Sequence, residues 1–154
     1  MSDDNVKIIT KNRKARHDYH ILETYEAGIV LRGSEVKSLR ENKASLSEAY
    51  ARVKKDEAYL VGAYIKPYEH TGLHDQPDSK RDLKLLLHRR EIRQIKKETA
   101  VKGNTLIPLS MYFRDGYAKV EIAVATGKKK YDKRQDIKER QAKREMDRAK
   151  KYHR

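Results

Sequence analysis

The residues best equipped for chemistry form a cluster of imidazole and carboxylate groups in the middle of the chain. His70, His74, Asp75 and Asp78 lie close together, and such groups could bind a metal ion. Glycine and proline interrupt the same stretch, which is equally typical of a solvated loop. We find no Gly-rich phosphate loop, no Ser-His-Asp order and no acid pair. We therefore expect no catalytic residue, no cofactor and no metal site, with the loop cluster as the open alternative.

A second group of side chains is suited to binding rather than to catalysis. The segment Asn12–His17 is basic, and the aromatic residues Tyr19 and Tyr25 follow it. Cations bind phosphates and aromatic rings stack on unpaired bases, which is how proteins bind RNA loops. A solvated segment is the alternative, but the combination favours RNA contact. Nearby, Glu26-Ala27-Gly28 places a carboxylate beside a flexible residue, which predicts a β-bulge rather than a catalytic acid.

The highest density of positive charge is in the last 28 residues, from Gly127 to Arg154. This tail holds thirteen Lys or Arg and five Asp or Glu, so it carries +8 of the whole chain's +14. It has too few apolar residues to make a core of its own. A single helix of this length is marginal in water, whereas a polyanion would stabilise it through its cations. The tail is therefore predicted to be disordered when free and helical when bound to nucleic acid.

The composition narrows the classes of partner and location. The chain has 154 residues, 39% of them charged, and no cysteine, so disulfides and thiolate metal sites are excluded. A strongly basic chain favours RNA or DNA as its partner. The tail lacks the Leu, Phe and Trp face of an interfacial helix. Because the chain begins MSDDNVK and has no long apolar run, we expect no leader, no membrane contact and a cytoplasmic location.

Short strands must position most of these residues. The clearest is Gly116–Thr126, where Ala118, Val120, Ile122 and Val124 alternate with polar residues such as Lys119. The other strands are expected at Tyr19–Leu31, Ala49–Val53, Ala58–Ile65, Leu83–Leu87 and Leu106–Phe113. Tight hairpin turns are predicted at Lys54–Glu57 and at Asp115-Gly116.

Two helices interrupt the strands. One is predicted at Gly33–Arg40 with Ser34 as its N-cap, and the other at Arg89–Lys102, ended by Gly103. About six short strands with two or three helices predict a mainly β fold, a small antiparallel barrel of the oligonucleotide-binding (OB) type. We expect two units: a barrel over residues 1–126 and the basic tail over residues 127–154.

Six blocks of sequence, in order along nearly the whole chain, resemble one family. They are Asn12–Tyr19, Tyr25–Gly28, Gly33–Arg40, Lys84–Leu87, Tyr117–Val120 and Gly127–Arg134. Together they are similar to the SmpB family, the SsrA-binding proteins of bacteria. The resemblance implies a barrel that binds the tRNA-like domain of transfer-messenger RNA and delivers it to stalled ribosomes for trans-translation. It also implies an adaptor without catalytic activity.

The resemblance further implies which residues act. The RNA-binding residues would be Asn12, Arg13, His17, Glu26, Leu86 and Lys119. The segment in the empty decoding centre and mRNA channel would be Gly127, Lys128, Lys129, Tyr131, Asp132, Lys133 and Arg134. Some relatives have histidine where this chain has Tyr131; both rings stack, but only histidine can become cationic near neutral pH. Whether elongation factor Tu joins through the charged RNA is left open.

Two other classes of function are compatible with the residues alone. A structural ribosomal protein would also have a basic barrel with a basic extension. An RNA-processing enzyme would use the cluster from His70 to Asp78. Stoichiometry on the ribosome separates the first class from an adaptor, and replacement of His70 and His74 tests the second.

Overall fold

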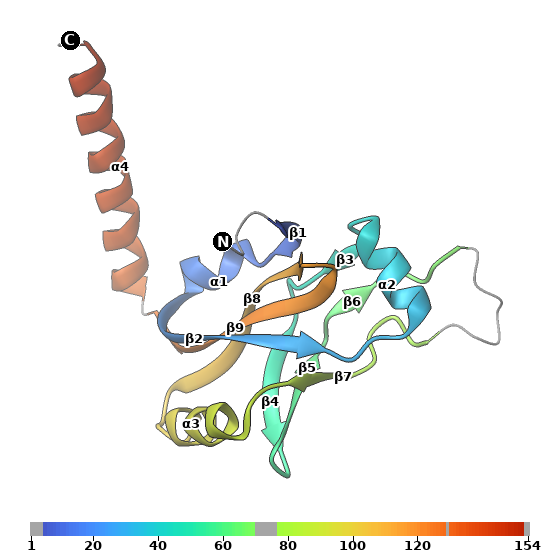
Figure 1. The fold of residues 1–154 in the computed structure, drawn as a ribbon. Coiled ribbons are helices and arrows are strands. Elements are labelled where there is room, and N and C mark those ends of the chain that lie inside the picture. Colours follow the sequence, from blue (N-terminus) through green and yellow to red (C-terminus); the bar gives the residue numbers. More distant parts are fainter. Residues whose placement is uncertain (1–4, 70–76, 129, 153–154) are drawn as a thin grey trace.

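The computed structural model describes residues 5–69, 77–128 and 130–152. The long strands and the helices are well separated in Figure 1. The strands are β1 (Val6–Lys11), β2 (Tyr19–Ile29), β3 (Ala44–Ser45), β4 (Tyr50–Lys54), β5 (Glu57–Val61), β6 (Tyr64–Ile65), β7 (Leu83–Leu86), β8 (Asn104–Arg114) and β9 (Tyr117–Gly127). The helices are α1 (Arg13–Asp18), α2 (Gly33–Arg40), α3 (Arg89–Thr99) and α4 (Lys130–Tyr152).

Strand pairing closes the sheet on itself. The order is β1-β8-β4-β5-β7-β2-β9, every pairing is antiparallel, and β9 also pairs with β8. The ring therefore runs β8-β4-β5-β7-β2-β9 and returns to β8, and β1 also pairs with β8, over Ser110–Arg114. Closure pairs the edges that an open sheet would leave exposed. The predicted mainly β, antiparallel fold is confirmed, and the barrel is compatible with the OB type.

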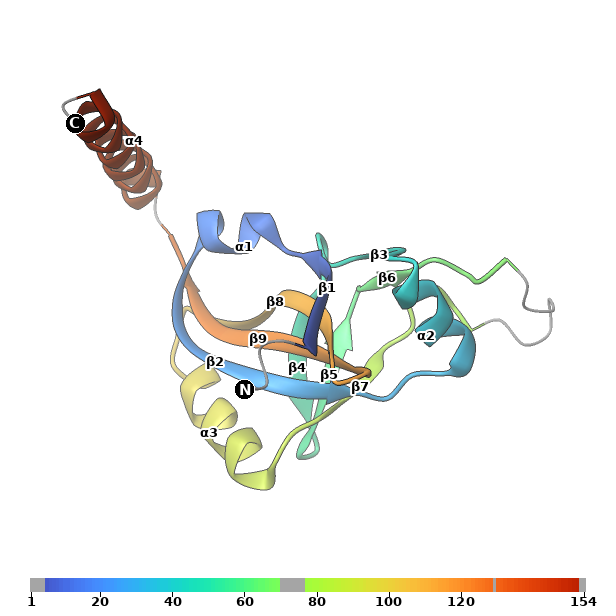
Figure 2. The same cartoon turned by 45° about the horizontal axis from the view of Figure 1, so that its top comes forward.

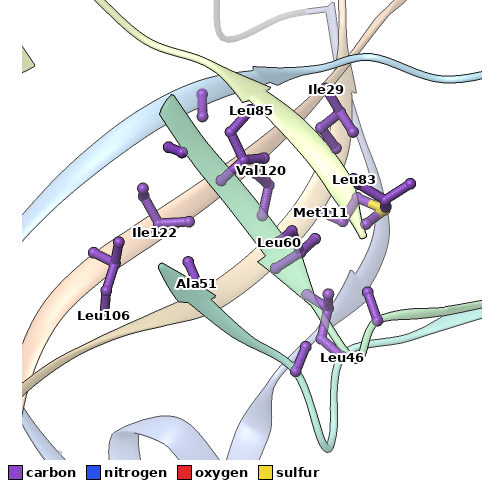
Figure 3. Close-up of a cluster of buried hydrophobic side chains, with 14 of the residues drawn as sticks. Ile29, Leu46, Ala51, Leu60, Leu83, Leu85, Leu106, Met111, Val120 and Ile122 are labelled. Atoms are coloured by element: carbon purple, nitrogen blue, oxygen red, sulfur yellow. The ribbon is translucent and has the colours of Figure 1, made fainter. Parts of the chain in front are cut away.

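The core lies inside this ring and follows the alternation of the strands. On β9, Val120, Ile122 and Val124 are fully buried, as the alternating pattern predicts. Apolar side chains from seven other strands meet them, and Figure 3 shows part of this cluster, including Leu60, Leu85 and Met111. The inward-facing residues of the strands therefore supply one continuous core.

The hairpin turns have the backbone geometry that their residues favour. Lys55 and Asp56 have positive φ angles of 52° and 61°, and Asp115 and Gly116 have 51° and 84°. Two successive positive φ angles define the type I′ turn, whose twist matches that of paired strands. The predicted strand Ala58–Ile65 is divided at Gly62, where φ is 78° and an added Cβ would lie 2.8 Å from the Glu48 carbonyl oxygen.

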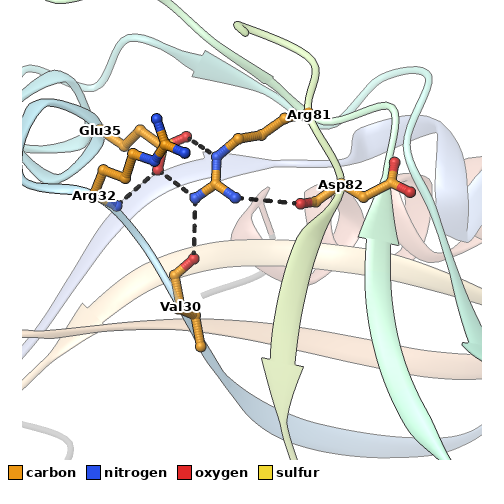
Figure 4. Close-up of polar contacts among 5 residues, drawn as sticks. All are labelled: Val30, Arg32, Glu35, Arg81 and Asp82. Carbon is orange, nitrogen blue, oxygen red and sulfur yellow. Dashed lines mark hydrogen bonds and ion pairs between the residues drawn. The ribbon is translucent and has the colours of Figure 1, made fainter. Parts of the chain in front are cut away.

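An ion pair fixes α2 and the strand entering the barrel, as Figure 4 shows. Arg81 donates to both carboxylate oxygens of Glu35, at 2.9 and 2.7 Å, and Glu35 also accepts the Arg32 N–H at 2.8 Å. Glu35 is only 4% exposed, and this partner raises the pKa of Arg81 further above its usual value. The helix cap is therefore Arg32 with Glu35, and the expectation that Ser34 caps α2 was wrong.

The third helix closes one end of the barrel. It buries Ile92 and Ile95, and the Tyr25 hydroxyl donates to Glu98 from β2. Burial and this carboxylate raise the pKa of Tyr25. The helix ends at Thr99, earlier than the predicted Lys102, because Asn104 donates its side-chain N–H to the Glu98 carbonyl and the chain turns at Gly103.

Three features were not expected from the sequence. The strand β1 pairs with β8, and the cluster Asn12–His17, for which no helix was predicted, forms most of the helix α1. The predicted bulge at Glu26–Gly28 is wrong: these residues pair in regular register, and β2 is irregular between Ile21 and Glu23 instead. Glu26 is consequently held on a regular strand.

Candidate nucleic-acid interface

The outer surface of β2, β9 and β8 is covered at one end by α1. Ala15 is 2% exposed and packs in a small apolar cluster with Ile107, Leu109, Ala123 and Ala125. Alanine at this position lets the short helix lie close to the strands. Along the outward face of β9, the residues therefore change from the charged Lys119 and Glu121 to the buried Ala123. The alternating pattern of the sequence did not indicate that Ala123 is buried.

Asn12 anchors the start of α1. Its side-chain N–H donates to the Pro108 carbonyl at 3.0 Å, and its backbone N–H donates to the Leu109 carbonyl at 2.8 Å. With Asn12 and Ala15 tied to β8, the side chains of Arg13 and His17 are exposed. His17 Nδ1 lies 2.9 Å from the Asp18 carboxylate, so the ring has a defined neighbour. Asn12 is thus a positioning residue in this structure, whereas Arg13 and His17 are accessible.

Beside α1, the strand register lines up Leu86, Gly28, Lys119 and Tyr112. Gly28 is opposite both Leu86 and Lys119, and Lys119 is opposite Tyr112. Directly paired residues point to the same face of a sheet, and the inward neighbours on these strands are core residues. The row therefore lies on the outside of the barrel.

Gly28 determines how Leu86 is presented. A Cβ on Gly28 would come within 3.3 Å of the Leu86 Cβ, so the leucine covers the bare backbone of the glycine. Leu86 is nevertheless 54% exposed. An exposed leucine on a flat strand surface can pack on a base or a ribose, and any larger residue at position 28 would push it away.

Glu26 is engaged by a residue that the sequence did not single out. Arg114 Nε donates to Glu26 at 2.9 Å, and the Arg114 guanidinium lies 5.6 Å from the centre of the Tyr112 ring. Hydrogen bonds to Glu26 and Tyr112 raise the pKa of Arg114 above its usual value, and burial raises the pKa of Tyr112. The carboxylate therefore holds the Arg114 cation against a buried aromatic ring, which fixes the position of a guanidinium suited to binding a phosphate.

An ion pair connects the outer surface of β9 with α1. Glu121 is opposite Glu26 on the neighbouring strand, and its carboxylate lies 3.8 Å from the Arg16 guanidinium. All six residues expected to bind RNA thus lie on or beside the outer surface of β7, β2, β9 and α1. The structure adds Arg16, Tyr112 and Arg114 to that surface. The only local signal for the last two is their spacing of two on one strand, an aromatic residue followed by a cation.

The tail leaves the barrel beside α1. The Lys128 N–H donates to the Asp18 carbonyl at 2.8 Å, and its side chain donates to the Arg16 carbonyl at 3.1 Å and pairs with Asp136 on α4. Lys128 lowers the pKa of Asp136. The Lys128 side chain is only 8% exposed, so in this conformation it joins α1 to α4 and does not face solvent.

The helix α4 extends away from the barrel, as Figures 1 and 2 show. Its side chains are described from residue 134 to 149, where all but Asp136 are exposed, including Arg134, Ile137 and Met146. Gly127 ends β9. Tyr131, Asp132 and Lys133 lie in the helical segment; Lys129 lies outside the described residues. A shallow groove between α1 and α4 is lined mainly by basic residues, namely Arg13, Arg16, His17, Lys128, Arg140 and Lys143 beside Asp136 and Glu139.

In residues 5–69, 77–128 and 130–152 no group of His, Cys, Asp or Glu could hold a metal ion. His70, His74 and Asp75 lie outside these ranges, so the loop cluster stays untested. In the same ranges, no helix has the length and apolar character needed to cross a membrane.

Comparison with known proteins yields one family. The family model described as SmpB protein matches residues 9–152. The chain is 54% identical over 144 residues to the SsrA-binding protein of Pelotomaculum thermopropionicum, covering 94% of each chain. It is 55% identical over 143 residues to the SsrA-binding protein of Thermobifida fusca, covering 93% of this chain and 89% of that one.

A solved structure gives the same result. A chain from the structure described as "tmRNA-SmpB: a journey to the center of the bacterial ribosome" is similar with a TM-score of 0.66 and 51% identity, covering 79% of this chain and 85% of that chain. The family match and the relatives each span more than nine-tenths of the chain. This chain belongs to the SmpB family.

Proposed function

We propose that this chain is an RNA-binding adaptor of trans-translation. It binds the tRNA-like domain of transfer-messenger RNA and brings that RNA to ribosomes stalled on truncated messages. The observation that carries the proposal is the continuous outer surface on which Arg13, His17, Glu26, Leu86 and Lys119 lie with the Arg114–Tyr112 pair. The SsrA-binding relatives and the similar tmRNA-SmpB chain support the identity of the RNA and of the ribosome as partners.

The division of this surface suggests how it recognises a folded RNA. Arg13 and Lys119 offer cations for phosphates, whereas Leu86 offers apolar surface for a base or ribose. The Tyr112 ring is buried and supports the Arg114 guanidinium. Because a closed sheet lies beneath them, the cations and the exposed leucine keep fixed separations. A fixed pattern of this kind suits the shape of a structured RNA better than an arbitrary single strand.

The tail has a different role in this proposal. Gly127, Lys128, Lys129, Tyr131, Asp132, Lys133 and Arg134 act in the empty decoding centre, and the rest of α4 lies along the mRNA channel. Cations on both sides of Tyr131 hold phosphates while its ring stacks on a base. A helix of 23 residues would be about 35 Å long, enough to follow a stretch of the channel. The adaptor acts in the cytoplasm and performs no catalysis itself.

The test is recovery and competition of bound RNA. The tagged full chain is purified under native conditions, and its RNA is sequenced; one structured RNA with a tRNA-like end is expected. Affinity for that tRNA-like domain is then compared with affinity for an ordinary tRNA in wild type, Lys119→Ala and the matched control Lys80→Ala. Lys119→Ala should weaken binding and lower the salt slope by roughly one, and the control should not. Equal affinity of the wild type for both RNAs would contradict the proposal.

A further inference from the structure

One lysine holds the junction between the barrel and the tail. The Lys128 side chain is only 8% exposed, donates to the Arg16 carbonyl at 3.1 Å and pairs with the Asp136 carboxylate. Its backbone N–H donates to the Asp18 carbonyl at 2.8 Å. In the proposed function Lys128 acts in the decoding centre, where its ammonium would have to face a phosphate. An ammonium enclosed in this way cannot do so, and the structure therefore describes a resting position of the tail.

Lys128 binds the end of α1 for a general reason. The last carbonyls of a helix have no partner within the helix and carry partial negative charge, so a cation is favourable there. Arg16 and Asp18 lie in the last turn of α1, and Lys128 donates to both of their carbonyls. Lys128 therefore caps α1 with a charge, and a partner that holds Lys128 also fixes where the chain leaves the barrel.

Asp136 attaches α4 to this cap. Among the α4 side chains that the structure describes, residues 134–149, Asp136 alone is partly buried and the others are exposed. Lys128 is the main cause that lowers the pKa of Asp136, and His20 on β2 and Arg140 contribute less. The carboxylate therefore faces the barrel and fastens the helix to it.

The ion pair of Lys128 and Asp136 can hold the tail and can also be exchanged. A nearly buried ammonium needs an anionic partner, because a carbonyl alone does not offset the hydration that it has lost. Without Asp136, the least costly arrangement turns Lys128 out into water, which detaches α4 from α1. The Asp136 carboxylate is 30% exposed, so another anion can reach its partner. The closely spaced phosphates of RNA are such anions.

Little else in the described part of α4 opposes release. Its large apolar side chains there, Ile137 and Met146, are 42% and 62% exposed, so they do not pack on the barrel. The walls of the groove between α1 and α4 are mainly basic, with Arg13 and Arg16 on one side and Arg140 on the other. Like charges repel. Once the ion pair opens, the two helices are therefore expected to separate.

We propose that Lys128 and Asp136 form a latch that keeps the basic tail docked on α1 in the free protein. Ribosomal RNA opens the latch by taking Lys128 from Asp136. The inference rests on the proposed function for the place where the tail acts. Its consequence is that protein without bound RNA binds ribosomes less tightly than a protein whose latch is broken. A latch closed in about nine molecules of ten weakens that binding about tenfold, because only the released fraction can bind.

The experiment compares Asp136→Ala with the matched control Asp147→Ala in the full chain. Each acid has a basic residue four positions later, so each variant loses one charge and one such pair and gains one alanine in the same helix. The chain has no cysteine, so Lys80→Cys on the barrel and Gln141→Cys on α4 introduce two unique sites for spin labels. Double electron–electron resonance then measures the distribution of distances between the labels.

For the wild type we expect one narrow distance distribution in solution. The control Asp147→Ala should keep it, and Asp136→Ala should broaden it. Ribosomes with a truncated message should shift the wild-type distribution to new distances. A broad wild-type distribution in solution would overturn the proposal, as would a distribution that stays narrow in Asp136→Ala.

Binding measures the consequence of the latch. Without bound RNA, Asp136→Ala should sediment with those ribosomes roughly threefold to tenfold more tightly than the wild type and Asp147→Ala, at one fixed salt concentration. All three proteins should have equal affinity for the isolated tRNA-like domain. Equal ribosome affinities would overturn the proposal. A parallel gain in affinity for the tRNA-like domain would mean that the docked tail blocks that RNA instead, and would also overturn it.

Failure of the proposed function gives a different result. In that case Asp136→Ala would still broaden the distances in solution, but ribosomes would leave the wild-type distances unchanged, which would overturn the opening by ribosomal RNA. Failure of the latch alone would leave intact the preference of the wild type for the tRNA-like domain over an ordinary tRNA.

Discussion

The outer barrel surface and the tail are both basic, but they present their charges in opposite ways. On the barrel, Arg114 is held by Glu26 against Tyr112, and Asn12 is tied to β8. On α4, nearly all described side chains are exposed, and an ion pair from Lys128 to Asp136 joins the helix to the barrel. A preorganised surface can distinguish one RNA shape from another, whereas a loosely joined cationic helix adapts to whatever polyanion surrounds it. We therefore propose that the barrel recognises the RNA and that the tail acts on the ribosome.

Removal of the tail should produce the largest effect and separate the two roles. A chain ending at Lys130 should still prefer the tRNA-like domain over an ordinary tRNA, with a modest loss of overall affinity because cations are removed. Peptide transfer to the alanyl-charged RNA on stalled ribosomes should fall to background. Single-turnover transfer and competition binding measure the two quantities. If the truncated chain no longer discriminated between the RNAs, recognition would have to include the tail.

Breaking the Arg81–Glu35 ion pair of the barrel should lower the stability more than breaking the ion pair at the start of the tail. Arg81→Ala leaves the buried Glu35 carboxylate without its partner, which should lower the free energy of unfolding by about 3 kcal/mol. Asp136→Asn removes the charge that pairs with Lys128 at the start of the tail and should lower that free energy much less, because the asparagine can still accept a hydrogen bond and Lys128 keeps its bond to the Arg16 carbonyl. Urea denaturation of the two variants checks this. Similar losses in both would mean that α4 is part of the barrel's cooperative unit.

The next prediction concerns one aromatic residue of the tail, Tyr131. Tyr131→Ala should leave binding to free transfer-messenger RNA unchanged and slow peptide transfer on stalled ribosomes by roughly tenfold, because stacking contributes about 1–3 kcal/mol per base. Tyr131→His keeps a stacking surface and should retain much of the activity.

A pH series of the Tyr131→His variant then tests ring charge, since histidine alone titrates near neutrality. Transfer rates that do not change in Tyr131→Ala would exclude this role for the ring.

The smallest expected effect concerns the pair of Glu26 and Arg114 on the barrel. Glu26→Gln keeps a hydrogen-bond acceptor but removes the charge that holds Arg114, so affinity for the tRNA-like domain should fall several-fold while the salt slope changes little. Arg114→Gln should weaken binding by a similar factor, and the double variant should lose little more than either single one, because the two side chains act as a pair. Additive losses would indicate that Glu26 contacts the RNA directly.

Local sequence patterns predicted much of the barrel. The alternation on β9 and the turns at Lys55-Asp56 and Asp115-Gly116 were correct, because side-chain periodicity and positive φ angles depend on neighbouring residues. The helix α1 was missed because it has six residues and depends on the packing of Ala15 against β8 and β9. The strand β1 was missed because its partner lies about a hundred residues away in the chain.

Some of the residues proposed to bind RNA were indicated by the sequence, and others became visible only in the structure. Resemblance to a family indicated Glu26, Leu86 and Lys119, and their roles stay predictions. Nothing local indicated that Arg114 would meet Glu26 across 88 residues of sequence. The basic character of the tail is visible in the sequence, but not that Lys128 would be enclosed between α1 and Asp136.

The amino-acid sequence by itself determined the charge of the barrel and of the tail, the strand periods and the tight turns, because each depends on residue type and short-range geometry. Only the tertiary structure decided which charges are free and which side of the sheet they occupy. Closure of β8 on both β4 and β9 sets one register for the whole ring. That register aligns Leu86, Gly28, Lys119 and Tyr112 in one outer row and places α1 and α3 on opposite sides of the same strands.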